Sequence, residues 1–150
     1  MSKNPWRAFP PNFHSLRGFF YDRRDDMTIG QALEEISEIQ PHSFGNERMI
    51  AWLRQLDMEL YEKIIRTHEG AEGVAKPEYT AASPDGTVLL VPEPYDCIYL
   101  HWLQSRIDYA MAEFGRYNNS NAMCEADRQE FAAWYNRTHM PVQQTGGKYF

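Results

Sequence analysis

Residues 95–117 read YDCIYLHWLQSRIDYAMAEFGRY, and this stretch decides the fold. Apolar residues recur at 98, 102, 103, 107, 110 and 114, the spacing of one face of a helix. A second apolar set falls at 95, 99, 109, 111 and 117 and is rich in tyrosine. One stripe would suit a surface helix with one buried side, so two stripes predict a helix that packs on both sides.

A second long helix is expected after it, from Asn121 to Thr138, where apolar and aromatic side chains return at roughly helical spacing. The five residues 117–121, Tyr-Asn-Asn-Ser-Asn, tolerate a turn and can cap a following helix. The sequence therefore predicts a long helix, a short polar joint at 117–121 and a second long helix within residues 94–140.

Two further helices are expected upstream. Thr28 stands at an N-cap position with Gln31 placed to complete a capping box, and Pro41 ends this helix of about three turns. Ser43 is a candidate cap for the next helix, which is expected to reach about His68. Its apolar stripe is predicted to be core: Met49, Trp52, Leu53, Leu56, Leu60 and Ile64.

Between residues 70 and 93 the helical signals stop. Glycine and proline turns surround a short β-prone run, Thr87–Val91, which can pair with 74–79 as a short β-hairpin. A loop of this length is usually functional or disordered, and in an assembly it can add strands to a neighbour. We predict an all-α fold: a four-helix domain at 27–141 with this long loop 70–93, an N-terminal arm 1–26 and a C-terminal tail 142–150.

Both ends of the chain carry aromatic residues. The N-terminal arm is punctuated by proline and shows no helical or strand period, so it is either a flexible extension before a natural start at Met27 or an arm that docks on a neighbouring surface. The docking residues would be Trp6, Phe9, Phe13, Phe19 and Phe20. The tail is either disordered or a tethered anchor that ends in Lys148, Tyr149 and Phe150.

Composition and charge narrow the function classes. The 150 residues form one domain by length, and the aromatic content of 14% is high. These aromatic residues either fill a small core, the expectation for any single one, or form protein interfaces, where they are enriched. The net charge is −6, with +2 on residues 1–26 and −8 on the rest. An acidic body argues against binding nucleic acid through its phosphates, although DNA can pass nearby. No apolar run approaches the roughly 18 residues of a membrane span.

The residues that carry chemistry form no recognisable catalytic motif. The five histidines are scattered, and neither HExxH nor a Cys–His pair at metal-ligand spacing is apparent. The two cysteines, Cys97 and Cys124, are expected to be buried, reduced thiols. We therefore predict no metal, no cofactor and no enzymatic activity.

Two polar features of the central helix, within residues 95–117, call for an interpretation. His101 and Ser105 lie on one helix face with Asp108 near, which we interpret as a hydrogen-bonded packing contact rather than a nucleophile site. Arg106 is expected to have a partner, either Asp108, Glu113 or a residue across an interface.

The order of several segments resembles the head–tail connector (adaptor) proteins of tailed bacteriophages and prophages of Gram-positive hosts. The resemblance covers about residues 27–141, and 1–26 departs from it. Its segments are MTIGQAL at 27–33, WLRQLD at 52–57, YEKIIRTHEG at 61–70, LLVPEPYD at 89–96, YLHWL at 99–103, IDYA at 107–110, YNNS at 117–120 and FAAWYNRTHMP at 131–141.

This resemblance implies a small helical subunit of a ring, usually dodecameric, beneath the portal protein of the virion neck. The ring would be assembled in the host cytoplasm, extend the DNA channel without binding DNA specifically, and receive the tail or stopper protein. In such proteins the C-terminal segment reaches the portal and the loop borders the channel or a neighbour. Carried to this chain, the portal-binding residues are Pro141, Val142, Lys148, Tyr149 and Phe150, and the loop residues are Lys76, Tyr79, Asp85, Leu89 and Val91.

The two-sided aromatic helix would supply lateral contacts between subunits, through Tyr95, Tyr99, Arg106 and Tyr109. The alternative function is a small cytoplasmic helical adaptor or regulator that binds one protein partner. An enzyme ranks third, because no constellation of residues supports it.

Overall fold

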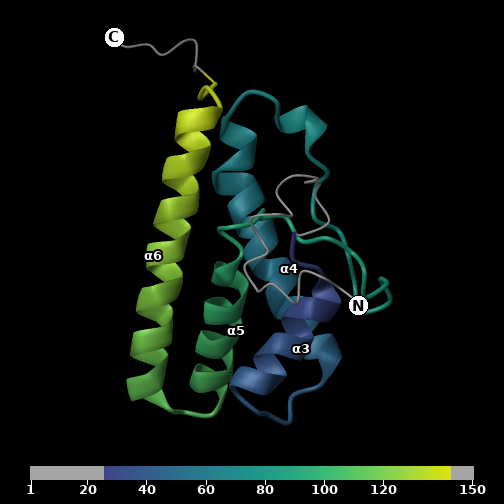
Figure 1. Cartoon of the computed structure of the whole chain (residues 1–150), viewed down its shortest axis with the longest axis vertical. Helices are drawn as coiled ribbons and strands as arrows, with labels where there is room; N and C mark the ends of the chain where they lie inside the picture. The colour runs from purple at the N-terminus through teal and green to yellow at the C-terminus, as the bar shows by residue number, and fades with distance from the viewer. Residues whose placement is uncertain (1–25, 143–150) are drawn as a thin grey trace, which may run out of the picture.

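The computed structural model describes residues 26–142. These residues form an all-α structure, as predicted, with no named strand among them (Figure 1). No helix in this part of the chain is both long and apolar enough to cross a membrane. The elements are α3 (Ile29–Ile39), α4 (Asn46–Lys63), the short 3-10 helices η4 (Ile65–Thr67) and η5 (Ala71–Gly73), α5 (Cys97–Ala110) and α6 (Phe114–Thr138).

The first helix begins at the predicted capping box. The Thr28 hydroxyl accepts a hydrogen bond from the Gln31 backbone N–H at 3.2 Å, and the Gln31 side chain accepts one from the Thr28 N–H at 3.0 Å. These two bonds satisfy backbone donors that the helix itself leaves free. The helix ends at Ile39, before Pro41, and its buried residues are Ile29, Ala32 and Ile36.

The second helix differs from the prediction at both ends. It begins at Asn46 after Gly45, without a side-chain cap, so the expected cap at Ser43 is wrong. It ends at Lys63 rather than near His68, because the chain tightens into the 3-10 turn η4. Its predicted apolar stripe is buried in the core, except for Trp52, which is half-buried.

The joint between the two long helices lies earlier than predicted. The chain leaves α5 at Ala110 and enters α6 at Phe114, so residues 117–121 belong to α6 and the expected joint there is wrong. Of those residues, Ser120 is buried, and its hydroxyl donates to the Asp108 carboxylate at 3.0 Å. The polar run is thus the solvated side of a helix with one inward-facing serine.

A Schellman motif makes the actual turn. The Glu113 N–H donates to the Asp108 carbonyl at 2.8 Å, and the Ala112 N–H donates to the Tyr109 carbonyl at 3.0 Å. Ala112 has a φ of 59°, in the left-handed region that usually holds glycine. The sequence signal for this turn is weak because alanine occupies the glycine position.

The core is centred on α5. This helix packs against α3, α4 and α6, whereas α6 lies along the outer side of α5 (Figure 1). The prediction of a helix packed on both sides is confirmed, since seven of its fourteen residues are buried. They are Ile98, Tyr99, Trp102, Leu103, Ser105, Ile107 and Asp108.

The segments outside the helices pair with distant parts of the chain. The β-prone run 87–91 does not form the hairpin considered above, because it pairs with the residues before α3. The Leu89 N–H donates to the Met27 carbonyl at 2.9 Å, and the Ile29 N–H donates to the Thr87 carbonyl at 2.9 Å. After α6, the Val142 N–H donates to the Thr67 carbonyl at 2.9 Å. Each end of the described chain is therefore fixed to the helical body.

Candidate functional site

An exposed apolar surface surrounds the turn between α5 and α6. We call it the turn patch and define it by Ile39, Tyr109, Met111 and Phe114, each of which is more than half exposed. They form two pairs: the Tyr109 ring contacts Phe114, with centroids 5.8 Å apart, while Ile39 and Met111 line a hollow of about 210 Å³ beside the turn. Large apolar side chains exposed around one turn in this way mark sites of protein contact.

The predicted lateral contacts divide into exposed and buried residues. Tyr109 belongs to the turn patch, and Tyr95 is half-buried with its ring 5.3 Å from that of Trp134. Tyr99 is fully buried, so its side chain does not reach a neighbouring molecule, and the prediction is wrong for this residue. Its hydroxyl donates a hydrogen bond to a buried carboxylate.

Arg106 has a different partner from the ones expected within the chain. Its guanidinium lies 4.8 Å from the centroid of the Trp102 ring and 5.6 Å from that of Tyr109. No ion pair joins it to Asp108 or Glu113 among residues 26–142, so both of those expectations are wrong. The cation is held by aromatic faces at the edge of the turn patch, a contact that stabilises a charge without a carboxylate.

The carboxylate that draws Tyr99 inward is Asp57 of α4. It is fully buried and accepts hydrogen bonds from the Tyr99 hydroxyl at 2.5 Å, the Tyr79 hydroxyl at 2.9 Å and the Leu90 N–H at 3.2 Å. The Tyr99 oxygen also accepts from the Val91 N–H at 2.7 Å. Burial raises the pKa of Asp57 to about 6, while its hydrogen bonds act in the opposite direction.

This network changes the interpretation of the loop. Tyr79, Leu89 and Val91, predicted to face a neighbour or the channel, are buried, so for their side chains the prediction is wrong. Lys76 and Asp85 are exposed. Asp57 was not among the predicted site residues, although an acidic residue between Leu56 and Leu60 in a core stripe is a detectable signal in the sequence.

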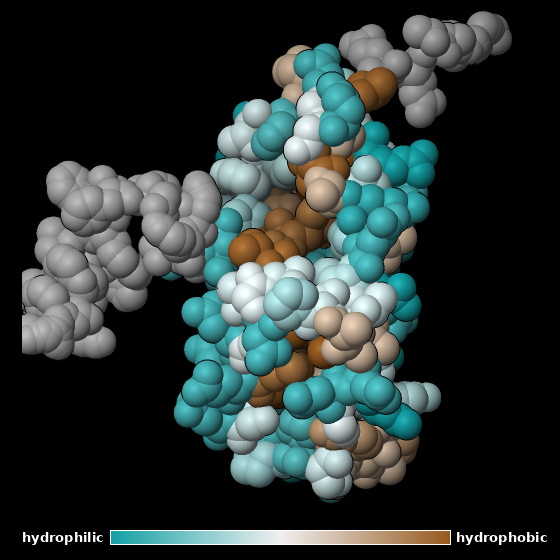
Figure 2. All heavy atoms as spheres, turned by 90° about the vertical axis from the view of Figure 1, so that its right-hand side faces the viewer, coloured by the Kyte–Doolittle hydropathy of each residue, from teal (hydrophilic) through white to brown (hydrophobic). Residues whose placement is uncertain are grey.

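The loop also borders a hollow of about 350 Å³. Its lining includes Asp57, Leu90 and Val88, and Val88 is about half exposed. Figure 2 looks onto this side of the molecule and shows hydrophobic residues at the bottom of hollows with polar surroundings. We call this surface the loop hollow, which is lined by Asp57, Ala75, Lys76, Pro77, Glu78, Tyr79, Ser83, Thr87, Val88 and Leu90.

An acidic groove of about 480 Å³ lies between α3 and the start of α5. It is lined by Glu34, Glu35, Glu38 and Asp96, together with Met27 and Gln31. The pKa of Asp96 is raised to about 6, first by burial and then by the charge of Glu93. The groove concentrates part of the negative charge predicted for the body of the protein.

The residues predicted to bind the portal begin at the far end of α6. Pro141 and Val142 are exposed, and the bonds that join 67–69 to 140–142 fix where the tail leaves the body. The other predicted anchor residues, Lys148, Tyr149 and Phe150, lie outside the described residues. So do those of the N-terminal arm, Trp6, Phe9, Phe13, Phe19 and Phe20.

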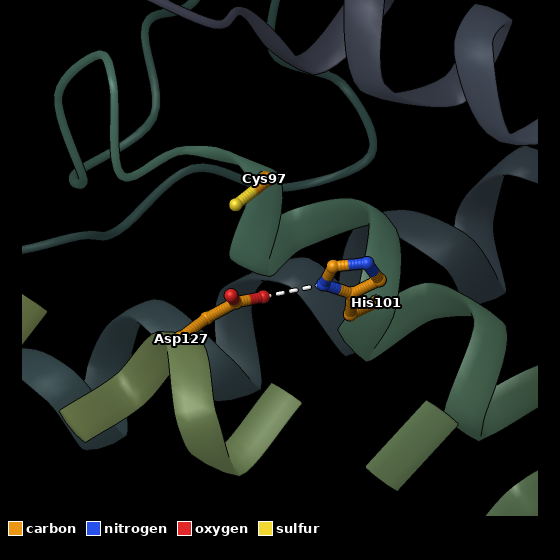
Figure 3. Close-up of side chains that lie close together, drawn as sticks. All are labelled: Cys97, His101 and Asp127. Carbon is orange, nitrogen blue, oxygen red and sulfur yellow. Dashed lines mark hydrogen bonds and ion pairs between the residues drawn. The ribbon is translucent and has the colours of Figure 1, made fainter. Parts of the chain in front are cut away.

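A second kind of site joins α5 to α6. Cys97 and His101 stand one turn apart on α5 and face Asp127 of α6 (Figure 3), and ligand atoms of the three lie within 4.8 Å of one another. The His101 Nδ1 is hydrogen-bonded to the Asp127 carboxylate. The pKa of Cys97 is raised to about 11, first by desolvation of the thiol and then by the Asp127 charge.

This cluster corrects two expectations. Cys97 is exposed rather than buried, whereas Cys124 is buried as expected. The Cys-x-x-x-His spacing on one helix was present in the sequence and was missed, and the contribution of Asp127 depends on the packing of α6. Ser105 takes no part, because its hydroxyl donates to the Trp102 carbonyl at 2.7 Å. This bond agrees with a packing role rather than a nucleophile site.

Comparisons with protein-family profiles, with curated proteins and with solved structures find no match for this chain.

Proposed function

We propose that this chain is a structural subunit of a head–tail connector, a ring beneath the portal that joins the capsid of a tailed bacteriophage to its tail. The observation that carries the proposal is the turn patch. Four large apolar side chains stay more than half exposed, whereas the core buries other aromatic side chains, such as Tyr99 and Phe131, almost completely. A surface of this kind is expected to be covered by another protein.

The apolar surfaces suit contacts between copies of the chain. The turn patch and the loop hollow are made of different residues, so a contact of one with the other is heterologous, and such contacts close into a ring when the rotation between subunits allows. In this arrangement the exposed Val88 and the half-buried Leu90 meet the turn patch of the next subunit. The loop thus keeps its proposed role at an interface, through residues other than the buried ones.

The two ends of the helical body support a bridging role. The turn patch lies at one end of the α5–α6 hairpin, and the chain leaves α6 at the other end, beside η4 (Figure 1). A segment starting at Val142 would reach the portal from that end. The contact with the next subunit, through the turn patch, and the contact with the portal, through this segment, therefore lie at opposite ends of the α5–α6 hairpin, so one copy can make both.

The charge fits a channel through which DNA passes. Each copy carries −6, so a ring of the size that the resemblance implies would carry on the order of −70. The acidic groove beside α3 contributes to this field. A negative wall repels phosphates and lets DNA slide, because retention of DNA on the wall would need clustered lysine and arginine.

The proposal is tested by light scattering of the purified full-length chain, alone and mixed with the portal protein of the same phage. The connector function predicts ring formation or a stable complex with the portal. A mass of 17.6 kDa, that of a monomer, both alone and with the portal protein present would contradict it. That outcome would favour the second candidate, a small adaptor whose turn patch binds a single partner.

A further inference from the structure

We propose that Cys97, His101 and Asp127 form a transition-metal site that binds Zn²⁺ and clamps α5 to α6. The inference is independent of the connector function. It rests on a thiol, an imidazole nitrogen and a carboxylate that two helices bring within 4.8 Å of one another (Figure 3).

The helix geometry places the three side chains together. Cys97 and His101 are i and i+4 on α5, which aligns them on one face. Asp127 projects from the neighbouring turn of α6, and its side chain is only 15% exposed. Because these positions are fixed by the main helix–helix contact of the protein, the ligands are largely pre-arranged.

The donor set matches zinc chemistry. Zn²⁺ takes thiolate, imidazole and carboxylate ligands at about 2.0–2.3 Å, which separates tetrahedral ligand atoms by roughly 3.3–3.6 Å. The three ligand atoms lie within 4.8 Å of one another, so binding requires them to close in by side-chain rotation, with the hydrogen bond between His101 and Asp127 replaced by two bonds to the metal. Binding forms an S–Zn bond and releases the thiol proton of Cys97 to solvent.

The surroundings favour a cation here. The nearest basic residue in sequence, Arg128, points to other acids, with its guanidinium 3.6 Å from Glu59 and 3.3 Å from Glu125. Asp127 therefore has no arginine partner of its own among residues 26–142. A thiolate and a carboxylate together balance the charge of a divalent ion. The protein supplies three ligands, which leaves the fourth coordination position of a tetrahedral Zn²⁺ ion. Because Cys97 is exposed, solvent can supply a water to this position, as in other zinc sites with three protein ligands.

The test is a titration of the reduced, tag-free full-length protein with Co²⁺, a spectroscopic substitute for Zn²⁺. We expect a thiolate-to-cobalt charge-transfer band and visible bands of a four-coordinate ion at one equivalent, with both removed by added Zn²⁺. Cys97→Ser should abolish the charge-transfer band, and Asp127→Asn should weaken binding about tenfold or more, while circular dichroism shows both variants folded.

The matched control is Cys124→Ser, which removes the other thiol and leaves the cluster intact. It should keep the band. The proposal is overturned if the wild-type protein shows no band, or if the band survives Cys97→Ser. Loss of the band in Cys124→Ser with retention in Cys97→Ser would place the metal elsewhere and would equally overturn it.

Discussion

The Tyr99 hydroxyl donates a 2.5 Å hydrogen bond to the carboxylate of Asp57, and both side chains are completely buried. The bond joins α5 to α4 in the centre of the core, and through Val91 it also fixes the end of the loop. A buried charge is tolerated only when its acceptor positions are filled, and here three donors fill them.

Removing the central hydroxyl should therefore be costly. Tyr99→Phe leaves the Val91 N–H without an acceptor and one Asp57 oxygen without its donor. We expect a loss of about 2–4 kcal/mol in the free energy of unfolding, measured by urea denaturation. Tyr109→Phe, at an exposed ring of the turn patch, should change it by less than about 0.5 kcal/mol. If the two substitutions lower the free energy of unfolding equally, the hydrogen bonds of the Tyr99 hydroxyl contribute no more to stability than an exposed hydroxyl does.

Asp57 should also make stability depend on pH. Its pKa is raised from 3.8 to about 6, so between these values the folded protein keeps a proton that the unfolded chain has released. The resulting stabilisation is complete below pH 3.8 and is lost as the pH rises through 6. We expect the stability of the wild type relative to Asp57→Asn to fall by about 2 kcal/mol from pH 4 to pH 7. A constant difference over this range would refute the assignment.

The turn between α5 and α6 offers a stabilising substitution. Ala112 has a φ of 59°, a conformation that costs an L-residue roughly 1 kcal/mol relative to glycine. Ala112→Gly should raise the free energy of unfolding by about 1 kcal/mol. The same change at Ala122, an exposed residue inside α6, should lower it by about 1 kcal/mol. If both glycines destabilise the protein, the left-handed turn is not the conformation in solution.

Local signals explain which parts of the fold the sequence predicts. The capping box at Thr28 and Gln31 and the apolar stripe of α4 depend on neighbouring residues alone, and both are confirmed. The joint was misplaced because Asn118 and Asn119 favour turns intrinsically. In the folded chain, packing on α5 and the inward bond of Ser120 keep this segment helical. Tertiary contacts outweighed a weak local preference.

The candidate sites were predicted less well, because they depend on which side chains meet across elements. Tyr99 and Tyr109 belong to the same predicted apolar stripe, yet Tyr109 is exposed. Burial of Tyr99 depends on Asp57, which is 42 residues earlier in the chain. The partner of Cys97 and His101 lies on a different helix. Sequence spacing shows which residues share a helix face but not what faces them.

The tail provides a test of portal attachment. Removing residues 142–150 should leave the fold intact but weaken binding to the portal, because the resemblance assigns that contact to the tail. A shorter deletion, of residues 143–150, keeps the hydrogen bond from Val142 to Thr67. Its free energy of unfolding should exceed that of the 142–150 deletion by about 1 kcal/mol, while portal binding should be lost to the same extent. Tailless protein that still yields infectious, DNA-filled particles would contradict the assignment.

The most direct test of the central claim is the mass of the assembly, measured by light scattering in the presence of portal protein. The wild type should assemble on the portal and add to its mass a multiple of 17.6 kDa. Phe114→Asp, which puts a charge in the turn patch, should stay monomeric, whereas Met123→Asp, at a similarly exposed apolar residue of α6 outside the patch, should still assemble. A wild type that remains a monomer, or a Phe114→Asp variant that assembles as well as the wild type, would contradict the account.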